Sequence, residues 1–243
     1  MSDTLHAILA HKPFTFPEQY KFDYDDVCVF SQKRIKTNLP FKKYKVEGVD
    51  DRIFGEFAIW KWLVENDKKH EWFVLHHYRR YLNTYYHHFC VAEPIHFNCS
   101  VLQQTAACHS VKLVQMLQSV MHPQDFALLN SLNYLLPYNM MSIHRDVLVE
   151  WVKFMDYYMT KLVQLIGISD YDTMVKTVAS DTTFTSNVMP NGQVNESKNC
   201  DPKYQCRIFA FLSERLNTLF WLKNMHLQPW YCTVDLLEQN QKI

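Results

Sequence analysis

The sequence predicts an α/β fold with a helix-rich C-terminal half, and three observations lead to this prediction. The apolar run Trp72–Leu75 consists of aromatic and branched residues, as in a strand that is buried on both faces. The preceding segment, Asp51–Asn66, has helical spacing and leads directly into that strand, which is the connection found in doubly wound α/β folds. Long helical patterns dominate the second half of the chain.

Short strands and one long loop are expected in the rest of the N-terminal half. Four apolar segments predict strands: Thr4–Ala10, Val27–Phe30, Phe89–Ala92 and Ile95–Phe97. The first of them ends at His11, Lys12 and Pro13, because proline blocks further ladder pairing. The polar and basic segment 31–49 predicts a long loop that is either mobile or covers a ligand.

Four helices account for most of the C-terminal half. Apolar spacing and flanking prolines place them at Gln103–Met121, Pro123–Leu136, Asp146–Ile166 and Gln205–Asn224. A short apolar strand, Met140–Ile143, precedes the third helix, and Gly167 ends that helix. The segment 169–203 is polar with little periodicity, so we expect an irregular and mobile excursion there.

Length and composition set the class of protein. The 243 residues are 48% hydrophobic, which suffices for one large core, so we expect a single domain over 1–243. The formal net charge is zero, which argues against nucleic acid as a partner and requires any anion site to be local. The seven cysteines are scattered and odd in number, and the first residues do not resemble a secretion signal, so we expect a cytoplasmic protein with reduced thiols.

The stretch EWFVLHHYRRYL, residues 71–82, carries the strongest local signal. Ligands of open α/β sheets lie beyond the carboxyl ends of the strands. Arg79 and Arg80 follow the central strand at such a place, and guanidinium groups match phosphate oxygens in a bidentate way. A phosphate-bearing ligand is one hypothesis for the two arginines, and pairing with surface carboxylates is the other.

Four separated segments carry motifs that belong together. They are AHKPF (10–14), GEFAIWKWLVEN running into FVLHHYRRYL (55–82), YNMMSIHRDVLVEW (138–151) and YQCRIFAFLSERLNTLFW (204–221). In this order they resemble the motifs of a bacterial and viral family of capsular-polysaccharide or lipopolysaccharide glycosyltransferases. The chain departs from the family pattern at Ala58, Lys61 and Val64, where the family has threonine, tyrosine and tryptophan.

The resemblance implies a GT-A-like, Rossmann-like fold, in which a mixed sheet is flanked by helices. It implies an enzyme that moves a hexosyl or pentosyl group from a nucleotide sugar, with a UDP-sugar as the expected donor, to a glycan or lipid-linked acceptor. It also implies that the nucleotide lies near the end of the first strand and its diphosphate near the end of the central strand.

The resemblance also suggests roles for individual residues. Donor or diphosphate binding is expected of the basic residues His11, Lys12, Arg79, Arg80 and Arg215. Catalytic roles are expected of Glu214, His77 and Arg79, with Glu214 as a general base or as a group that orients the sugar. Sugar or acceptor contacts are expected of Asn139 and Tyr78. Structural alternatives remain for most of them: exposed or turn-forming residues at the strand ends, and ion pairs within the last helix.

A metal-dependent GT-A enzyme has an Asp-x-Asp at the end of the central strand, where this chain has HHYRR (76–80). We therefore expect no protein-bound metal and assign the stabilisation of the departing diphosphate to the arginines and His77, although Mg²⁺ or Mn²⁺ remains compatible. Acidic pairs at residues 23–25 and 170–172 are interpreted as solvated turns. Zinc binding by His76, His77, His87 and His88 is a minor alternative, because neighbouring strand residues face opposite sides.

Two further functional classes remain open. One is a non-catalytic nucleotide-sugar-binding or scaffold protein with the same fold, which the missing Asp-x-Asp favours. The other is nucleic-acid binding through the basic run Lys33–Lys45, which the neutral net charge opposes. No stretch approaches the roughly 20 apolar residues of a membrane span, but helices rich in Trp, Tyr and Met suit peripheral association with the cytoplasmic membrane face.

Overall fold

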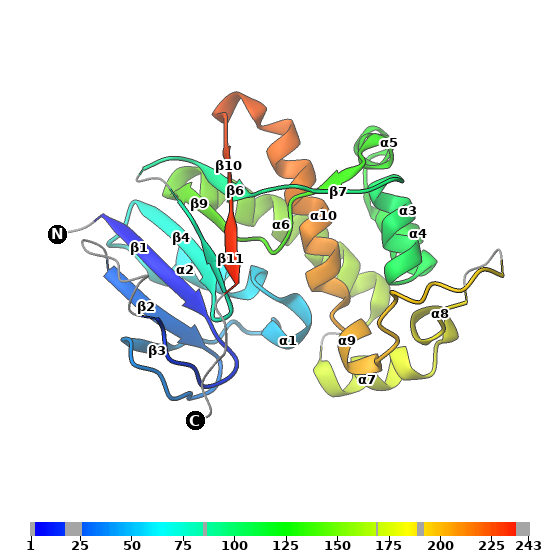
Figure 1. The fold of residues 1–243 in the computed structure, drawn as a ribbon, viewed down its shortest axis with the longest axis horizontal. Helices are drawn as coiled ribbons and strands as arrows, with labels where there is room; N and C mark the ends of the chain where they lie inside the picture. The colour runs from blue at the N-terminus through cyan, green and yellow to red at the C-terminus, as the bar shows by residue number, and fades with distance from the viewer. Residues whose placement is uncertain (1–2, 18–25, 85–86, 169, 189–191, 237–243) are drawn as a thin grey trace.

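The computed structural model describes residues 3–17, 26–84, 87–168, 170–188 and 192–236. These residues form a mixed β-sheet flanked by helices, with a large helical half on one side of the sheet (Figure 1). The expectation of a mixed α/β sheet with a helix-rich C-terminal half is therefore confirmed.

One half of the sheet is parallel. Its strands are β1 (Thr4–Leu9), β2 (Asp26–Ser31), β3 (Phe41–Lys43) and β4 (Trp72–His77). β1 lies between β2 and β4, and β3 extends the sheet beyond β2. Leu9 pairs with both Phe30 and His77, so β1, β2 and β4 end at the same edge. The central strand continues two residues beyond the apolar run that predicted it, and both of its histidines belong to the strand.

The other half of the sheet is mixed. Its strands are β5 (Arg80–Leu82), β6 (Cys90–Ala92), β9 (Met141–His144), β10 (Trp230–Cys232) and β11 (Val234–Leu236). β9 is antiparallel to β4 and β6, which gives the order β10-β6-β9-β4-β1-β2-β3. β5 folds back on β4 and also pairs with β11. A separate two-stranded sheet consists of β7 (Ile95–His96) and β8 (Tyr134–Leu135).

Four helices pack against one another: α1 (Asp51–Phe54), α2 (Phe57–Asn66), α6 (Arg145–Ile166) and α10 (Ile208–Lys223). α2 packs on α6, and α6 packs on α10. The helical half adds α3 (Val101–Cys108), α4 (Val111–Val120), α5 (Pro123–Ser131), α7 (Tyr171–Ala179), α8 (Thr182–Thr185), α9 (Pro202–Gln205) and the 3-10 turn η2 (Met225–Leu227). Within the described ranges, no helix is both long and apolar enough to cross a bilayer.

Three tryptophans form the centre of the core between the sheet and the helices. Trp60, Trp151 and Trp221 are almost completely buried, and the rings of Trp60 and Trp151 meet edge to face with 6.2 Å between their centroids. The Trp151 indole N–H donates to Asn217 Oδ1 at 2.9 Å, so this buried polar atom is satisfied. The long helices α6 and α10 are thereby fixed to each other and to α2.

Several predicted elements are divided or shortened in the structure. The predicted helix over 51–66 breaks into α1 and α2 at Gly55, whose φ of 59° lies in the left-handed region. The predicted helix over 103–121 breaks into α3 and α4 because Ser110 caps a new helix. The predicted helix from Pro123 ends at residue 131 instead of 136, where the chain enters β8.

The two segments predicted as long loops contain regular structure. Segment 31–49 includes β3, a short edge strand whose lysines hid its apolar pattern. Segment 169–203 includes α7 and α8 and the start of α9, each begun by an aspartate whose side chain accepts a backbone N–H in the first turn. Helices this short lack the repeated apolar spacing by which a helix is predicted from sequence.

Candidate functional site

The candidate site lies at the carboxyl ends of β1 and β4. His11 follows β1, while Tyr78 and Arg79 form the tight turn that joins β4 to β5. The Tyr78 N–H donates to the Leu9 carbonyl at 2.9 Å, which holds this turn against the end of β1. His77 and Arg80 pair across the hairpin, so the structure brings most residues of the HHYRR motif to one corner.

Two histidines and a tyrosine form the aromatic floor of this corner. The His11 ring lies 5.6 Å from His77 and 4.8 Å from Tyr78 between centroids, and the Tyr78 hydroxyl is 3.3 Å from His11 Nε2. Burial, followed by repulsion from neighbouring cations, lowers the pKa of His77 to about 2. Desolvation and the charge of Arg207 lower the pKa of His11 to about 4. Both rings are therefore neutral at pH 7, and the positive charge expected of His77 comes from the arginines instead.

Three arginines supply that charge. Arg79 is exposed and lies over the Tyr78 ring, with 5.2 Å from its guanidinium carbon to the ring centroid. Arg80 is half-buried and lies over Tyr138 at 4.3 Å, and its buried Nε has no hydrogen-bond partner within the described ranges. Arg207 immediately precedes α10 and lowers the pKa of both His11 and His77. In the part of the chain that the structure describes, none of the three forms an ion pair with a carboxylate.

Arg207 was not among the residues predicted from sequence, although it lies in the fourth motif segment. Helical periodicity places Arg207, Ala210 and Glu214 on the same face of α10. That face packs on the end of α1 so closely that a Cβ on Gly55 would come within 2.9 Å of the Ala210 Cβ. The contact places the next residue, Glu56, beside Arg207 and Glu214.

Glu56 is the second residue that was not predicted from sequence. The helical spacing of its segment did not indicate that its side chain lies near the arginines. It is only 9% exposed. Burial raises the pKa of Glu56, and Glu214 raises it further, while the charges of Arg207 and Arg80 oppose the shift. The site therefore contains a buried carboxylate next to its cations.

Glu214 is held in place by two hydrogen bonds. Its Oε1 accepts the backbone N–H of Tyr138 at 2.9 Å, and its Oε2 accepts from Arg215 Nη1 at 3.2 Å. The side chain remains 21% exposed, so it faces the site from α10 while its two oxygens are already engaged.

The turn Tyr138–Asn139 closes the site on the side of β9. Both residues have positive φ, 69° and 50°, which costs energy in residues other than glycine. The Asn139 side-chain N–H donates to Ser213 Oγ at 2.7 Å, and the Asn139 carbonyl accepts from the Trp60 indole at 2.9 Å. Asn139 Oδ1 is buried and has no hydrogen-bond partner among the residues that the structure describes.

Arg215 is not brought into this group. It is 1% exposed, and its guanidinium donates to Thr105 Oγ1 at 2.9 Å, to Gln104 Oε1 at 2.6 Å and to the Phe211 carbonyl at 2.9 Å. These bonds direct it towards α3, so the expectation of diphosphate binding by Arg215 finds no support in its position. Lys12 lies exposed beside His11, at the rim of the site.

The acidic and histidine-rich motifs are dispersed. The pair at residues 23–25 lies outside the described residues, and Asp170 accepts the Thr173 N–H as the cap of α7. His76 Nε2 lies 3.0 Å from His6 Nδ1, and His88 stacks on Trp230. Over the described ranges, no three His, Cys, Asp or Glu side chains gather in a metal-binding arrangement.

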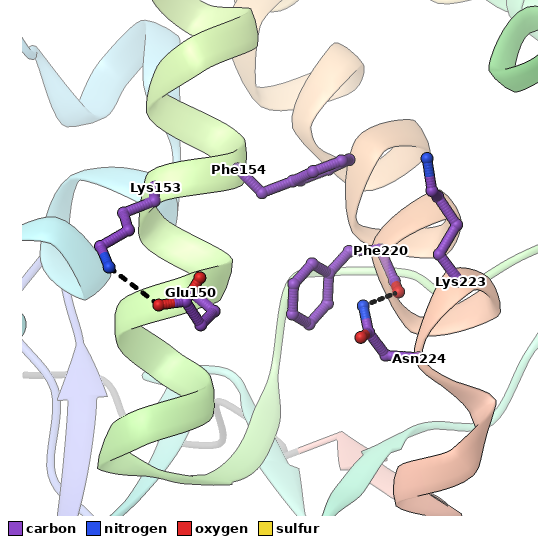
Figure 2. A pocket seen from close by; sticks show the side chains of 6 residues that line it. All are labelled: Glu150, Lys153, Phe154, Phe220, Lys223 and Asn224. Atoms are coloured by element: carbon purple, nitrogen blue, oxygen red, sulfur yellow. Dashed lines mark hydrogen bonds and ion pairs between the residues drawn. The ribbon is translucent and has the colours of Figure 1, made fainter.

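A surface pocket of about 450 Å³ lies elsewhere, between α6 and the C-terminal end of α10 (Figure 2). It is lined by Glu150, Lys153, Phe154, Phe220, Lys223 and Asn224. Its charges are paired: Lys153 with Glu150 at 2.8 Å, and Lys223 with Asp125 at 2.8 Å. No residue predicted to be functional lines it, so it does not compete with the corner at β1 and β4.

Comparison with known proteins bears on the fold. No protein-family model and no curated protein matches the chain. A search of solved structures finds the apo structure of WbbM, a bifunctional glycosyltransferase. The chain shares the fold of a glycosyltransferase. The match has a TM-score of 0.64 at 10% sequence identity and covers 98% of this chain and 46% of that one, so this chain spans about half the length of WbbM. The expected GT-A-like fold is thereby confirmed.

Proposed function

We propose that this protein is a glycosyltransferase that moves a sugar from a nucleotide-sugar donor to a glycan or lipid-linked acceptor. The observation that carries the proposal is a group of three arginines at the strand ends that form no ion pair with a carboxylate among the described residues, in a fold shared with WbbM. Unpaired cations at this edge of an α/β sheet are suited to a phosphate ligand.

In this proposal the arginines bind the diphosphate and stabilise it as it leaves. Negative charge develops on the departing nucleoside diphosphate, and donors fixed beforehand at that point lower the barrier. Arg79, Arg80 and Arg207 fill this role, and neutral His11 and His77 add hydrogen bonds. A UDP-sugar is the expected donor. A divalent ion such as Mg²⁺ or Mn²⁺ would share the charge of the diphosphate if it accompanied the donor.

The sugar is expected on the side of the Tyr138–Asn139 turn. Asn139 Oδ1 is an acceptor without a partner among the described residues, and in this proposal it receives a sugar hydroxyl. Glu214 orients the sugar, because its two hydrogen bonds fix the carboxylate beside this turn. Tyr78, which contacts His11, lines the boundary between the donor and the acceptor.

We further propose that the protein acts in the cytoplasm, at the membrane face when the acceptor is lipid-linked. Two aromatic residues on β10, Trp230 and Tyr231, are each 47% exposed. Such side chains favour the boundary between water and lipid headgroups. This supports peripheral association and leaves the site itself in water.

The test is turnover of nucleotide sugars by the purified protein. The protein would be incubated with UDP-glucose, UDP-galactose, UDP-N-acetylglucosamine and GDP-mannose, with and without Mn²⁺, and free nucleoside diphosphate would be measured. We expect release from a UDP-sugar by the wild type and at least a tenfold slower release by Arg80→Ala. Binding of UDP by calorimetry without any release would support the non-catalytic binding protein instead, and neither binding nor release would refute both.

A further inference from the structure

The candidate site contains two carboxylates, which differ in the hydrogen bonds that they accept. We infer that Glu56, and not Glu214, takes the proton from the acceptor hydroxyl during sugar transfer. This inference rests on the proposed function and assigns its general base.

Glu214 is poorly placed for that role because both of its oxygens already accept hydrogen bonds. Tyr138 donates its backbone N–H to one oxygen, and the buried Arg215 donates to the other. Each of its oxygens therefore already has a donor within the fold. To accept a proton, Glu214 would also have to release the Tyr138–Asn139 turn that it holds.

Glu56 has no comparable restraint. Although it stands at the N-cap position of α2, its side chain caps no backbone N–H of that helix. Across the described residues, its carboxylate accepts no hydrogen bond from another side chain, and the hydrogen bond that it does accept comes from its own backbone N–H. Gly55 and Ala210 hold its backbone against α10, which places the carboxylate near the cations. Glu56 can therefore take up a proton without releasing another part of the site.

The surroundings of Glu56 also raise the pKa of its carboxyl group. Burial disfavours its charged form and raises its pKa, and the carboxylate of Glu214 on α10 acts in the same direction. Arg207 at the start of α10, the backbone N–H of Glu56 itself and Arg80 on β5 oppose the shift. Tyr44 also faces Glu56, but its own pKa is raised well above 10, so it stays neutral. A carboxylate with a raised pKa accepts a proton more readily than a solvated one.

The proposed step is a displacement at the anomeric carbon of the donor sugar. The acceptor oxygen forms a new bond to this carbon, and its proton passes to the Glu56 carboxylate. The bond from the anomeric carbon to the phosphate oxygen breaks, and the electron pair leaves with the nucleoside diphosphate. Arg79, Arg80 and Arg207 receive the resulting charge. Glu56 then returns its proton to water.

The experiment compares Glu56→Gln with Glu214→Gln on whichever UDP-hexose of the panel the wild type cleaves. For Glu56→Gln we expect release of UDP to slow by about 10²–10⁴-fold, the usual contribution of a general base. UDP affinity measured by calorimetry should stay within about threefold of wild type. The rate of the wild type should rise with pH through the pKa of Glu56, and this dependence should be lost in Glu56→Gln but retained in Glu214→Gln.

The melting temperature of Glu56→Gln distinguishes a catalytic role of Glu56 from a structural one. The raised pKa means that ionised Glu56 opposes folding at neutral pH, so the neutral glutamine should leave the melting temperature unchanged or higher. Loss of turnover together with a lower melting temperature and weaker UDP binding would show that Glu56 only pairs with Arg207, and would overturn the inference. Full turnover by Glu56→Gln would overturn it while leaving the proposed function intact. A wild type that releases no nucleoside diphosphate would instead refute the proposed function, and the inference with it.

Discussion

The amino and carboxyl ends of the parallel strands contain similar residue types, but they differ in whether the charged side chains form ion pairs. At the amino ends, buried His70 lies between two carboxylates, with Nδ1 2.8 Å from Asp67 and Nε2 2.9 Å from Asp26. Lys69 also pairs with Asp26, and Arg145 lies 3.3 Å from Asp67. Every charge in this cluster has a partner from the protein itself.

At the carboxyl ends the three arginines form no ion pair with a carboxylate in the part of the chain that the structure describes. Arg79 and Arg80 lie over tyrosine rings, and Arg207 faces neutral histidines and the buried Glu56. Arg145 at the other end also lies over a ring, that of Phe73, yet it is additionally bonded to Asp67 and to the His70 carbonyl. The amino-end charges are therefore paired within the fold, whereas the carboxyl-end arginines are the cations that the proposed function assigns to the diphosphate.

The largest effect is expected at Arg215, which the structure assigns to the interior. Arg215→Ala should lower the free energy of unfolding by about 3–5 kcal/mol, because it removes a buried charge and leaves its partners on α3 unsatisfied. Urea denaturation measures this change. The exposed Arg79→Ala serves as control and should stay within about 0.5 kcal/mol of wild type. Equal losses in the two variants would contradict the assignment.

The next largest effect concerns Arg80 and Arg145, a matched pair from the two ends of the sheet. Arg80→Ala should weaken UDP binding by about 2–3 kcal/mol, or roughly 30–150-fold, because charge-assisted hydrogen bonds to the diphosphate are lost. Arg145→Ala should leave UDP affinity unchanged and lower stability instead. Calorimetry and thermal melting of both variants measure the contrast. If Arg145→Ala weakened UDP binding as much as Arg80→Ala, the distinction between the two ends would fail.

A smaller effect is expected at Gly55, which fixes Glu56 beside α10. Gly55→Ala should destabilise the protein by about 1–3 kcal/mol, because its Cβ meets the Ala210 Cβ at 2.9 Å and its φ is 59°. It should also slow turnover, since Glu56 would move relative to Arg207. Gly48→Ala is the matched control, because its φ is 70° but no atom lies within 4 Å of the added Cβ. Equal effects of the two substitutions on turnover would contradict the claim that the packing of Gly55 against Ala210 positions Glu56.

The smallest effect concerns the pH dependence of the paired cluster. Hydrogen bonds from Lys69 and then His70 lower the pKa of Asp26, so its ion pairs stabilise the fold above the unfolded pKa of 3.8 and this stabilisation is lost as the pH falls through the lowered value. In His70→Gln the hydrogen bond between the imidazole and Asp26 is lost. The drop in unfolding free energy between pH 5 and pH 3, measured in urea, should therefore be smaller than in wild type. An unchanged drop would show that His70 does not contribute.

The sequence predicted the sheet and the corner where the HHYRR motif lies better than it predicted which other residues lie at that corner. The strand Trp72–Leu75 and the arginines after it were recognisable because apolar runs and adjacent charges are local signals. Arg207 and Glu56 were not recognisable, because they are brought near each other by the packing of Gly55 against Ala210. These two residues are far apart in the sequence. Helical spacing likewise did not reveal that α10 directs Arg215 towards α3 and Glu214 towards the site.

The most direct test of the central claim is a crystal structure of the protein soaked with UDP. The two phosphates should lie against Arg80, with Arg79 and Arg207 on either side and the His11 and His77 rings within hydrogen-bonding distance. The uracil should lie beyond the end of β1, and the amino-end cluster around His70 should be unchanged. A diphosphate bound away from all three arginines, for example in the pocket between α6 and α10, would contradict the account.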